Sequence, residues 1–479
     1  MRRSGAAICI AGIAFRKAGG AKLPENIKQR SAPAEAASHR RVARTLRPRR
    51  GKLGRSFVAA VGKSGPMSSQ APAYATESAG RAHTRPGSHD DRRPVVLHWV
   101  FGHLRKRGSF EDYLVAAAEE LARAGLRLHV VARLLIDPAV RSALEERGAG
   151  VTCAPDEDLN NSGFFARTVW RLRPSLVHCH FGSPSTSLAL LAKALGVRRF
   201  VFTDHGSRTS LESGAATASL RGLRRMFLAS FVDLYLPVSD FVGEQIRREV
   251  GAPRRKVKRL FNGVDLGRFR PVAGPDERSR LRASLGVEPD RRCVFYVGQF
   301  TDLKGVDDIL AIQDEVLRRK DDVAFIWIGD GPLAPEVERR TSARVRYLGL
   351  RNDVEALLPA ADLILAPSRW HEAFCLTVAE AAASGVPAVA ARVGGVPEVV
   401  LDGKTGLLIE PGDRAALLES CVRLLTDEPL RAAMAAAARR RAETSFSLAT
   451  MVRDTLRHYQ ALGLRTRDVE PTSFPRAGS

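Results

Sequence analysis

The stretch CVFYVGQFTDLKGVDDIL, residues 293–310, contains a pattern that recurs through most of the chain. Its apolar first part, 293–300, predicts a buried strand, and a short polar loop then leads into a helical pattern that begins near Gly305. Lys304 stands in that loop, just before the predicted helix. A cation opposes the helix dipole at this position, so the sequence favours a partner of opposite charge, such as a diphosphate, over a solvated surface lysine.

Similar apolar runs alternate with helical patterns on both sides of this stretch, and such alternation predicts parallel, doubly wound α/β sheets. The series breaks at the polar, proline-bearing segment 270–292 and then starts again, so we predict two Rossmann-like domains. In open parallel sheets the ligand lies beyond the carboxyl ends of the strands, and two facing sheets therefore place a site in the cleft between them. The predicted strands are 95–101, 126–134, 150–154, 175–180, 199–205, 232–239 and 256–261 in the first domain, and 293–300, 323–329, 345–349, 362–368, 387–391 and 406–410 in the second.

Length and composition agree with a two-domain protein. The chain has 479 residues, of which 44% are hydrophobic and 27% charged, enough to build two cores of ordinary size. The first domain is predicted to span 94–270 and the second 271–445, and 446–479 is predicted to form a C-terminal helix and a polar tail. Six scattered cysteines without a CxxC pair indicate neither a zinc site nor a disulfide framework, which fits a reducing cytosol.

The net charge of +23 is concentrated at the beginning of the chain. Residues 1–93 hold 20 Lys and Arg against 5 Asp and Glu, and they show no sustained periodicity. We predict a basic disordered extension, and Met67 is an alternative start that would leave most of it out of the native protein. A module that binds nucleic acid or anionic lipid through this segment is a further alternative.

The segment HEAFCLTVAEA, residues 371–381, places two glutamates around the start of an alanine-rich helix. Glu372 precedes the helix and Glu380 is expected about two turns inside it. A helix start binds phosphate through its free N–H groups, so one carboxylate can accept sugar hydroxyls and the other ribose hydroxyls. Isolated glutamates would more simply be a loop charge and a surface residue, but the following strand, 386–391, runs into Gly394-Gly395, a turn expected to bring backbone close to a ligand.

An ordered set of motifs gives the strongest indication of the fold and the function. Between residues 94 and 463 the chain carries SLVHCH, FTDHG, LYLPVSDFV, LFNGVDLGRF, YVGQFTDLKGV, LAPSRWHEAFCLTVAEA, VGGVPEVV and DGKTGLLIEPGD, in that order. This set resembles the retaining glycosyltransferases of family 4, which have the GT-B architecture of two Rossmann-like domains facing a cleft. The resemblance implies an acceptor domain at 94–270 and a nucleotide-sugar domain at 271–445.

The same resemblance implies a catalytic role for three residues. Glu372 would bind hydroxyls of the transferred sugar close to the reacting carbon, and Lys304 would stabilise the departing nucleoside diphosphate. His205 would contact the sugar from the opposite domain, although a histidine at the end of a strand is by itself more often a core residue. Glu380 would bind the nucleotide ribose.

Other positions are implied in donor binding. Backbone amides near Leu376 and Thr377 would hold the diphosphate, and Gly108 would belong to a turn near the phosphates. Asn262 lies in a block that resembles the family's hinge, where turn chemistry explains it equally well. Gln299 is a departure, since the family usually has an arginine there that works beside the lysine, and a neutral amide donates a weaker hydrogen bond.

The implied reaction moves a sugar from a nucleotide-sugar donor to a hydroxyl of a glycan or lipid-linked acceptor, with retention of the anomeric configuration. It implies front-face attack and needs no metal, no other cofactor and no nucleic acid. The expected setting is cytoplasmic synthesis of cell-envelope polysaccharide or exopolysaccharide. The basic helix-like stretch 220–231 leaves open a peripheral contact with the inner face of the membrane.

Two alternative functions are considered beside sugar transfer of this kind. A sugar phosphorylase or a nucleotide-sugar epimerase would share the fold and differ in chemistry, although no convincing lysine for the phosphorylase cofactor is found. Asp156-Glu157-Asp158 imitates the metal-binding motif of the other main glycosyltransferase fold. It is expected far from the nucleotide-binding blocks, so an ordinary acidic loop is the favoured interpretation.

Overall fold

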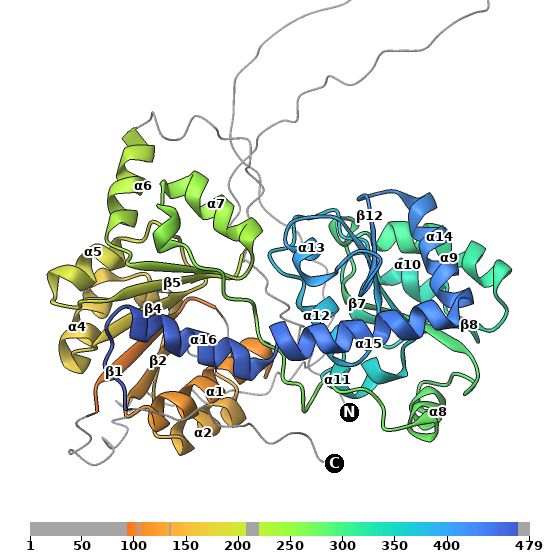
Figure 1. Ribbon diagram of the computed structural model, residues 1–479, viewed down its shortest axis with the longest axis horizontal. Helices are drawn as coiled ribbons and strands as arrows, with labels where there is room; N and C mark the ends of the chain where they lie inside the picture. The colour runs from red at the N-terminus through yellow and green to blue at the C-terminus, as the bar shows by residue number, and fades with distance from the viewer. Residues whose placement is uncertain (1–92, 103, 105–106, 134–135, 207–219, 468–479) are drawn as a thin grey trace, which may run out of the picture. The chain divides into compact units, whose positions relative to one another are not determined.

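The computed structural model describes residues 93–102, 104, 107–133, 136–206 and 220–467, and Figure 1 shows their arrangement. The predicted basic extension lies outside the described residues except for Arg93, and so does the alternative start at Met67. The two predicted parallel sheets are both present. The prediction of an α/β fold with two doubly wound sheets is therefore confirmed.

The first sheet has six parallel strands in the order β3-β2-β1-β4-β5-β6. The strand order reverses between β1 and β4, because β2 and β3 extend the sheet on one side of β1 and β4 to β6 extend it on the other. Its strands are β1 (Val95–Val100), β2 (Arg127–Arg133), β3 (Gly150–Ala154), β4 (Leu176–His180), β5 (Phe200–Asp204) and β6 (Leu234–Pro237). The helices between them are α1 (Ser109–Arg123), α2 (Pro138–Glu146), α3 (Asp156–Leu159), α4 (Ser162–Leu172), α5 (Ser187–Ala194), α6 (Leu220–Ser230) and α7 (Asp240–Val250).

The second sheet repeats this topology. Its order, β12-β11-β10-β7-β8-β9, again places the first strand at the centre, next to the second and the fourth. Its strands are β7 (Arg292–Gln299), β8 (Val323–Asp330), β9 (Val345–Tyr347), β10 (Leu363–Ala366), β11 (Ala388–Ala391) and β12 (Gly406–Ile409). Its helices are α8 (Pro275–Ser284), α9 (Val306–Arg319), α10 (Ala334–Arg339), α11 (Val354–Leu357), α12 (Leu376–Ala383), α13 (Val396–Val399), α14 (Arg414–Thr426) and α15 (Glu428–Ser445).

One predicted strand, 256–261, was wrong. The chain makes a 3-10 turn at Arg254–Lys256 and a single bridge between Tyr235 and Val257. The backbone N–H groups of Lys258 and Leu260 still bond to carbonyls of β6, at 3.0 and 2.8 Å. The segment follows the outer edge of the sheet with exposed basic side chains and then leaves it, so no ladder develops.

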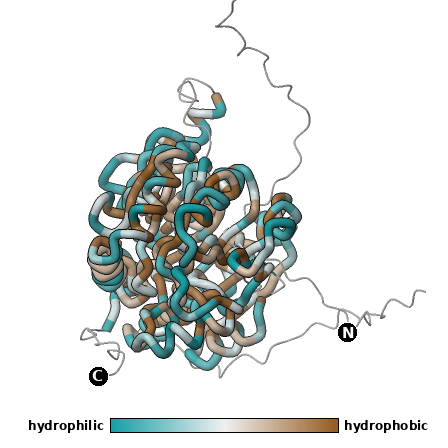
Figure 2. The backbone as a smooth tube through the Cα atoms, turned by 90° about the vertical axis from the view of Figure 1, so that its right-hand side faces the viewer, coloured by the Kyte–Doolittle hydropathy of each residue, from teal (hydrophilic) through white to brown (hydrophobic). Residues whose placement is uncertain are grey.

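Strands β1, β4, β5, β7 and β8 are buried along almost their whole length, as expected for parallel strands covered on both faces. The edge strands β3 and β9 are only partly buried. Trp99 of β1 and Trp327 of β8 are among the largest fully buried side chains. In Figure 2 hydrophobic segments run through the interior and hydrophilic ones along much of the periphery. The two cores therefore follow directly from the apolar runs in the sequence.

The last helix, α16 (Leu448–Ala461), returns to the first domain. It lies beside α1 (Figure 1), and the hydroxyl of Tyr113 on α1 bonds to that of Thr455 at 3.5 Å. The crossing is fixed by backbone hydrogen bonds from Val264 to Phe446 and from Leu448 to Val264, at 2.7 and 2.9 Å. The first domain is thus completed by residues from the far end of the chain.

Candidate functional site

Two of the predicted residues meet where the strand order of the second sheet reverses. Lys304 follows β7, Glu372 follows β10, and these two strands are neighbours. The ammonium of Lys304 lies 2.6 Å from a carboxylate oxygen of Glu372, with 26% and 16% of the side chains exposed. The carboxyl ends of strands at such a reversal are where doubly wound folds bind ligands, so the pair occupies a favourable place for a site.

Backbone contacts hold the Lys304 loop against the loop that leads to Glu372. The carbonyl of Leu303 accepts hydrogen bonds from the N–H groups of Arg369 and Trp370, at 2.9 and 3.1 Å. Gly305 has φ +70°, and a Cβ there would lie 2.1 Å from the carbonyl oxygen of Pro367. Only glycine permits this approach, so the ion pair is positioned by the backbone.

The Gly394-Gly395 turn brings backbone close to the Glu372 loop. The N–H of Gly395 donates to the carbonyl of Glu372 at 2.7 Å. A Cβ on Gly394, which has φ +54°, would lie 2.1 Å from the same oxygen. The two glycines therefore allow a close approach that fixes the backbone of a candidate catalytic residue, and their approach to a ligand stays a prediction.

The start of α12 is suited to an anion. Leu376 and Thr377 are its first two residues, no side chain caps it, and Cys375 before it has φ +71°. Its first N–H groups have no partner within the helix, and they coincide with the positive end of the dipole. Glu380 is the fifth residue of α12, so it lies little more than one turn from the start and not two as predicted.

Glu380 contacts the first domain. Its carboxylate accepts a hydrogen bond from the hydroxyl of Ser109 at 3.1 Å. Ser109 is the first residue of α1 and follows Gly108, the N-cap, which has an ordinary extended conformation. Gly108 thus leads directly to Ser109, which contacts Glu380, a predicted nucleotide-binding residue. A ligand hydroxyl would have to replace this contact.

His205 and Asn262 also lie together. His205 follows β5 and hydrogen-bonds to Asn262, a contact that raises its pKa, while burial lowers the pKa more strongly, to about 3. The ring of Phe181, which has φ +61°, stacks on that of His205 with centroids 4.2 Å apart. The imidazole is therefore neutral at pH 7 and has a fixed ring plane.

Gln299 ends β7, and its side chain is exposed. Its backbone carbonyl accepts a hydrogen bond from the hydroxyl of Tyr296 at 2.7 Å. It thus shares the carboxyl end of β7 with the Lys304 loop, and whether it contacts a diphosphate stays a prediction.

A contact between the two domains was missed by the sequence reasoning. The carboxylate of Glu398, on α13, accepts hydrogen bonds from the N–H groups of Asp240 and Phe241 at the start of α7, at 2.8 and 2.9 Å. Both partners lie in motifs noted in the sequence, since Glu398 belongs to the VGGVPEVV block and the start of α7 belongs to the LYLPVSDFV block. Nothing in either motif, however, pairs a carboxylate with a distant helix start.

The acidic triplet Asp156-Glu157-Asp158 forms the first turn of α3, after the edge strand β3. Asp156 pairs with Arg133 at 2.8 Å. The triplet thus belongs to the outer edge of the first sheet, whereas Lys304 and Glu372 follow central strands of the second.

Comparisons with known proteins agree with this geometry. A family model described as "Glycosyltransferase Family 4" matches residues 110–268, and one described as "Glycosyl transferases group 1" matches 291–427. The chain is 31% identical over 340 residues to the GDP-mannose-dependent alpha-(1-6)-phosphatidylinositol monomannoside mannosyltransferase of Mycolicibacterium smegmatis, covering 67% of this chain and 80% of that protein. It is 29% identical over 292 residues to the N-acetyl-alpha-D-glucosaminyl L-malate synthase of Bacillus anthracis, covering 60% and 74%.

Solved structures show the same fold at lower identity. Anabaena Alr3699/HepE in complex with UDP and glucose has a TM-score of 0.62 and 22% identity, covering 77% of this chain and 100% of that one. A glycosyltransferase from Rickettsia africae has a TM-score of 0.64 and 20% identity, covering 78% and 99%.

Proposed function

Since the chain belongs to the family 4 glycosyltransferases of the GT-B fold, we propose that it transfers a sugar from a nucleotide-sugar donor to a hydroxyl acceptor with retention of the anomeric configuration. The observation that carries this proposal is the Lys304–Glu372 pair, 2.6 Å apart beside the uncapped start of α12. A cation, helix N–H groups and a carboxylate together match a sugar diphosphate, which has anionic oxygens next to hydroxyls.

In this mechanism the donor replaces the ion pair between Lys304 and Glu372. Its diphosphate replaces the carboxylate as the partner of Lys304 and meets the N–H groups of Leu376 and Thr377. Glu372 then accepts hydrogen bonds from hydroxyls of the sugar, and Glu380 accepts them from the ribose in place of Ser109. Negative charge grows on the leaving diphosphate as the glycosidic bond breaks, so a cation held there lowers the barrier.

The acceptor hydroxyl attacks the anomeric carbon from the face that the diphosphate leaves. The bond from carbon to phosphate oxygen breaks, the bond from carbon to acceptor oxygen forms, and the proton of the hydroxyl passes to the leaving phosphate oxygen. Attack from this face retains the configuration without a covalent enzyme intermediate. We propose that Lys304 supplies the positive charge, so that turnover persists in the presence of a chelator.

The donor can be identified by its effect on stability. One relative named above is GDP-mannose-dependent, and one structural neighbour holds UDP and glucose, so UDP-, GDP- and ADP-sugars should be screened. At one hundred times its dissociation constant a true donor adds about 2.7 kcal/mol of stability and raises the unfolding midpoint by roughly 5 °C.

Two variants make this screen specific to the site. Glu380→Ala should lose most of the shift, because it removes the proposed ribose contact, while Glu157→Ala, in the acidic triplet of α3, should keep it. A nucleotide sugar that stabilises both variants equally would place donor binding elsewhere, and the absence of a shift with any of them would contradict the proposal.

We also propose that α6 rests on an anionic membrane near a lipid-linked acceptor, in the synthesis of cell-envelope polysaccharide at the inner face of the membrane. Leu220, Leu223 and Phe227 are 83%, 56% and 58% exposed at helical spacing, and Arg221, Arg224 and Arg225 are exposed beside them. Apolar side chains flanked by basic ones are typical of helices that lie in a membrane surface. In the part of the chain that the structure describes, the helices are too short or too polar to cross a bilayer.

Vesicle binding tests this contact. Three basic residues near an anionic surface contribute about 1 kcal/mol each, so binding should be roughly 100-fold tighter to vesicles with phosphatidylserine than to neutral ones. Leu223→Ser with Phe227→Ser should abolish binding in a flotation assay, and Leu401→Ser, at an exposed position of the second domain, should not. Equal binding by the double variant would rule out α6.

A further inference from the structure

One arginine side chain contacts the backbone turn that carries Lys304 on both of its sides. Arg369 lies in the loop after β10, and one of its terminal nitrogens donates to the backbone carbonyl of Asp302 at 3.4 Å. The other donates to the carboxylates of Asp307 and Asp308, at 2.7 and 2.5 Å. Asp302 precedes Lys304 by two residues, and the two aspartates follow it in the first turn of α9. The guanidinium therefore bridges the two ends of the turn.

The turn has little apolar packing of its own. It is a short 3-10 turn, Asp302–Lys304, and its one apolar side chain, Leu303, is 53% exposed. The place of the turn therefore depends on polar contacts. The backbone bonds to the carbonyl of Leu303 hold its middle, and the guanidinium of Arg369 holds the chain before and after it.

The same arginine belongs to the loop of the second candidate catalytic group. Arg369 precedes Glu372 by three residues, and the carboxylate of Glu372 lies 2.6 Å from the ammonium of Lys304. A guanidinium holds its N–H donors in a rigid planar fork, so it can bond to several acceptors in a fixed arrangement. The bridge is thus a second link between the two loops, beside the ion pair itself.

A second arginine, Arg414, makes similar ion pairs without the bridge. It is the first residue of α14, and its guanidinium lies 2.7 Å from Asp308 and 3.0 Å from Asp307, on the same carboxylate oxygens that Arg369 uses. Within the part of the chain that the structure describes, its side chain bonds to these two aspartates alone. The side chain of Asp308 is only 2% exposed, so a carboxylate without a cation would be costly there. With two arginines present, each aspartate keeps a partner when one arginine is removed.

We propose that Arg369 is a positioning residue that sets the place of Lys304 relative to Glu372, and so relative to the leaving diphosphate. Its effect on transfer rests on the proposed function, while the bridge itself does not. A displacement of about 1 Å at a reacting group can cost as much as about 10²-fold in rate. An arginine that does no chemistry therefore acts on the reaction through the lysine.

Direct contact with the donor is the competing role for Arg369. Its positive charge is offset by two carboxylates, and it would have to leave them in order to bind a diphosphate. Lys304 already lies beside the uncapped start of α12 and would exchange only its pairing with Glu372. The observed contacts therefore favour positioning, and a double variant distinguishes the two roles.

Transfer kinetics of the full chain test the proposal with a matched control. Arg369→Ala should lower kcat about 10-fold, and Arg414→Ala, which removes ion pairs to the same aspartates, should leave it unchanged. In the Lys304→Ala background the effect of Arg369→Ala should disappear, because a residue that acts through Lys304 has nothing left to position. Arg369→Lys keeps a cation beside the aspartates and should recover part of the loss.

Hydrogen exchange in the turn measures the bridge without any substrate. Arg369→Ala should accelerate exchange of the N–H groups of Lys304 and Gly305, which bond to the carbonyls of Thr301 and Asp302 at 3.1 and 3.0 Å. Arg414→Ala should not. If Lys304→Ala itself keeps full turnover, the proposed function fails, and the exchange result then decides whether Arg369 holds the turn.

Three results would overturn the proposal. Equal losses of kcat in Arg369→Ala and Arg414→Ala would show that the aspartate cluster only supports the fold. An undiminished effect of Arg369→Ala in the Lys304→Ala background would indicate direct contact with the donor. Unaltered exchange in Arg369→Ala would show that the turn does not depend on the bridge. Thermal unfolding shows whether each variant is folded, and Arg369→Lys with the same double variant decides if Arg369→Ala is not.

Discussion

Lys304→Ala is expected to lower kcat by a factor of 10² to 10³, with the fold intact. The ammonium is the proposed partner of the leaving diphosphate, and removing one such group typically costs about 3–4 kcal/mol of transition-state stabilisation. Glu372→Ala should have a loss at least as large, because this carboxylate is proposed to hold the sugar next to the reacting carbon. Initial rates with the donor found in the thermal screen measure both.

Lys404→Ala, at an exposed lysine of the second domain, is the matched control and should leave kcat unchanged. The two single losses should not add in the double variant, because Lys304 and Glu372 are paired with each other. Unchanged turnover in both single variants would contradict the proposed site. Loss of turnover in the control as well would indicate a general effect of charge.

Lowering the pH from 7.5 to 5.5 should decrease the free energy of unfolding by about 5 kcal/mol. Burial lowers the pKa of His98 and of His205 to about 3 and that of His129 to about 4, and it holds those of His178 and His180 well below the usual value. In this interval the unfolded chain binds a proton at each histidine and the folded protein does not, so stability falls with pH. Each histidine contributes about 1.4 kcal/mol.

Glu111 opposes this effect. Burial at the start of α1 raises its pKa to about 7, so the folded protein takes up a proton there as the pH falls while the unfolded chain, with a pKa near 4.5, does not. That uptake offsets about 2 kcal/mol of the loss. Glu111→Gln should therefore enlarge the loss of stability to about 7 kcal/mol, as measured by urea unfolding at the two pH values. Equal stability of the wild type at pH 7.5 and 5.5 would show that the buried histidines are not kept neutral.

The sequence was sufficient for the sheets and for part of the site. Apolar runs predicted the strands because parallel strands are covered on both faces, and the failure at 256–261 arose where a similar run follows an edge with basic side chains exposed. Lys304 and Glu372 could each be predicted from the motif that contains it, but their pairing with each other was not predicted. The contact of Glu380 with Ser109 could not, since it joins residues 271 positions apart in different domains.

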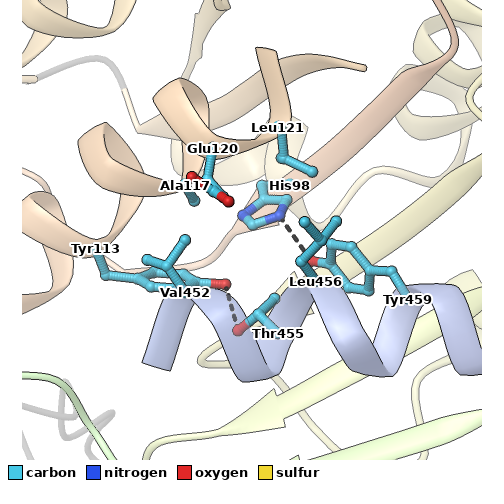
Figure 3. Close-up of a pocket in the computed structure, with 9 residues that line it drawn as sticks. All are labelled: His98, Tyr113, Ala117, Glu120, Leu121, Val452, Thr455, Leu456 and Tyr459. Carbon is cyan, nitrogen blue, oxygen red and sulfur yellow. Dashed lines mark hydrogen bonds between the residues drawn. The ribbon is translucent and has the colours of Figure 1, made fainter. Parts of the chain in front are cut away.

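His178 and His180 are visible in the SLVHCH motif, but their hydrogen-bond partners could not be predicted from the sequence. A period of two places His178 and His180 on one face of β4, and the register with β1 adds His98. Tyr459 belongs to a helix near the C-terminal end of the chain. Only the packing of α16 against α1 brings it close to these histidines, as Figure 3 shows for His98. Burial of a polar network depends on tertiary contacts that no local pattern encodes.

The return of α16 to the first domain has a consequence for synthesis on the ribosome. Domains of large chains usually fold in the order in which they emerge, the N-terminal one first. Here the segment that covers α1 and supplies Tyr459 emerges only after the whole second domain has been made. Until then the nascent first domain exposes its apolar face and an unfinished polar core, so the first domain is complete only after the second domain has been synthesised.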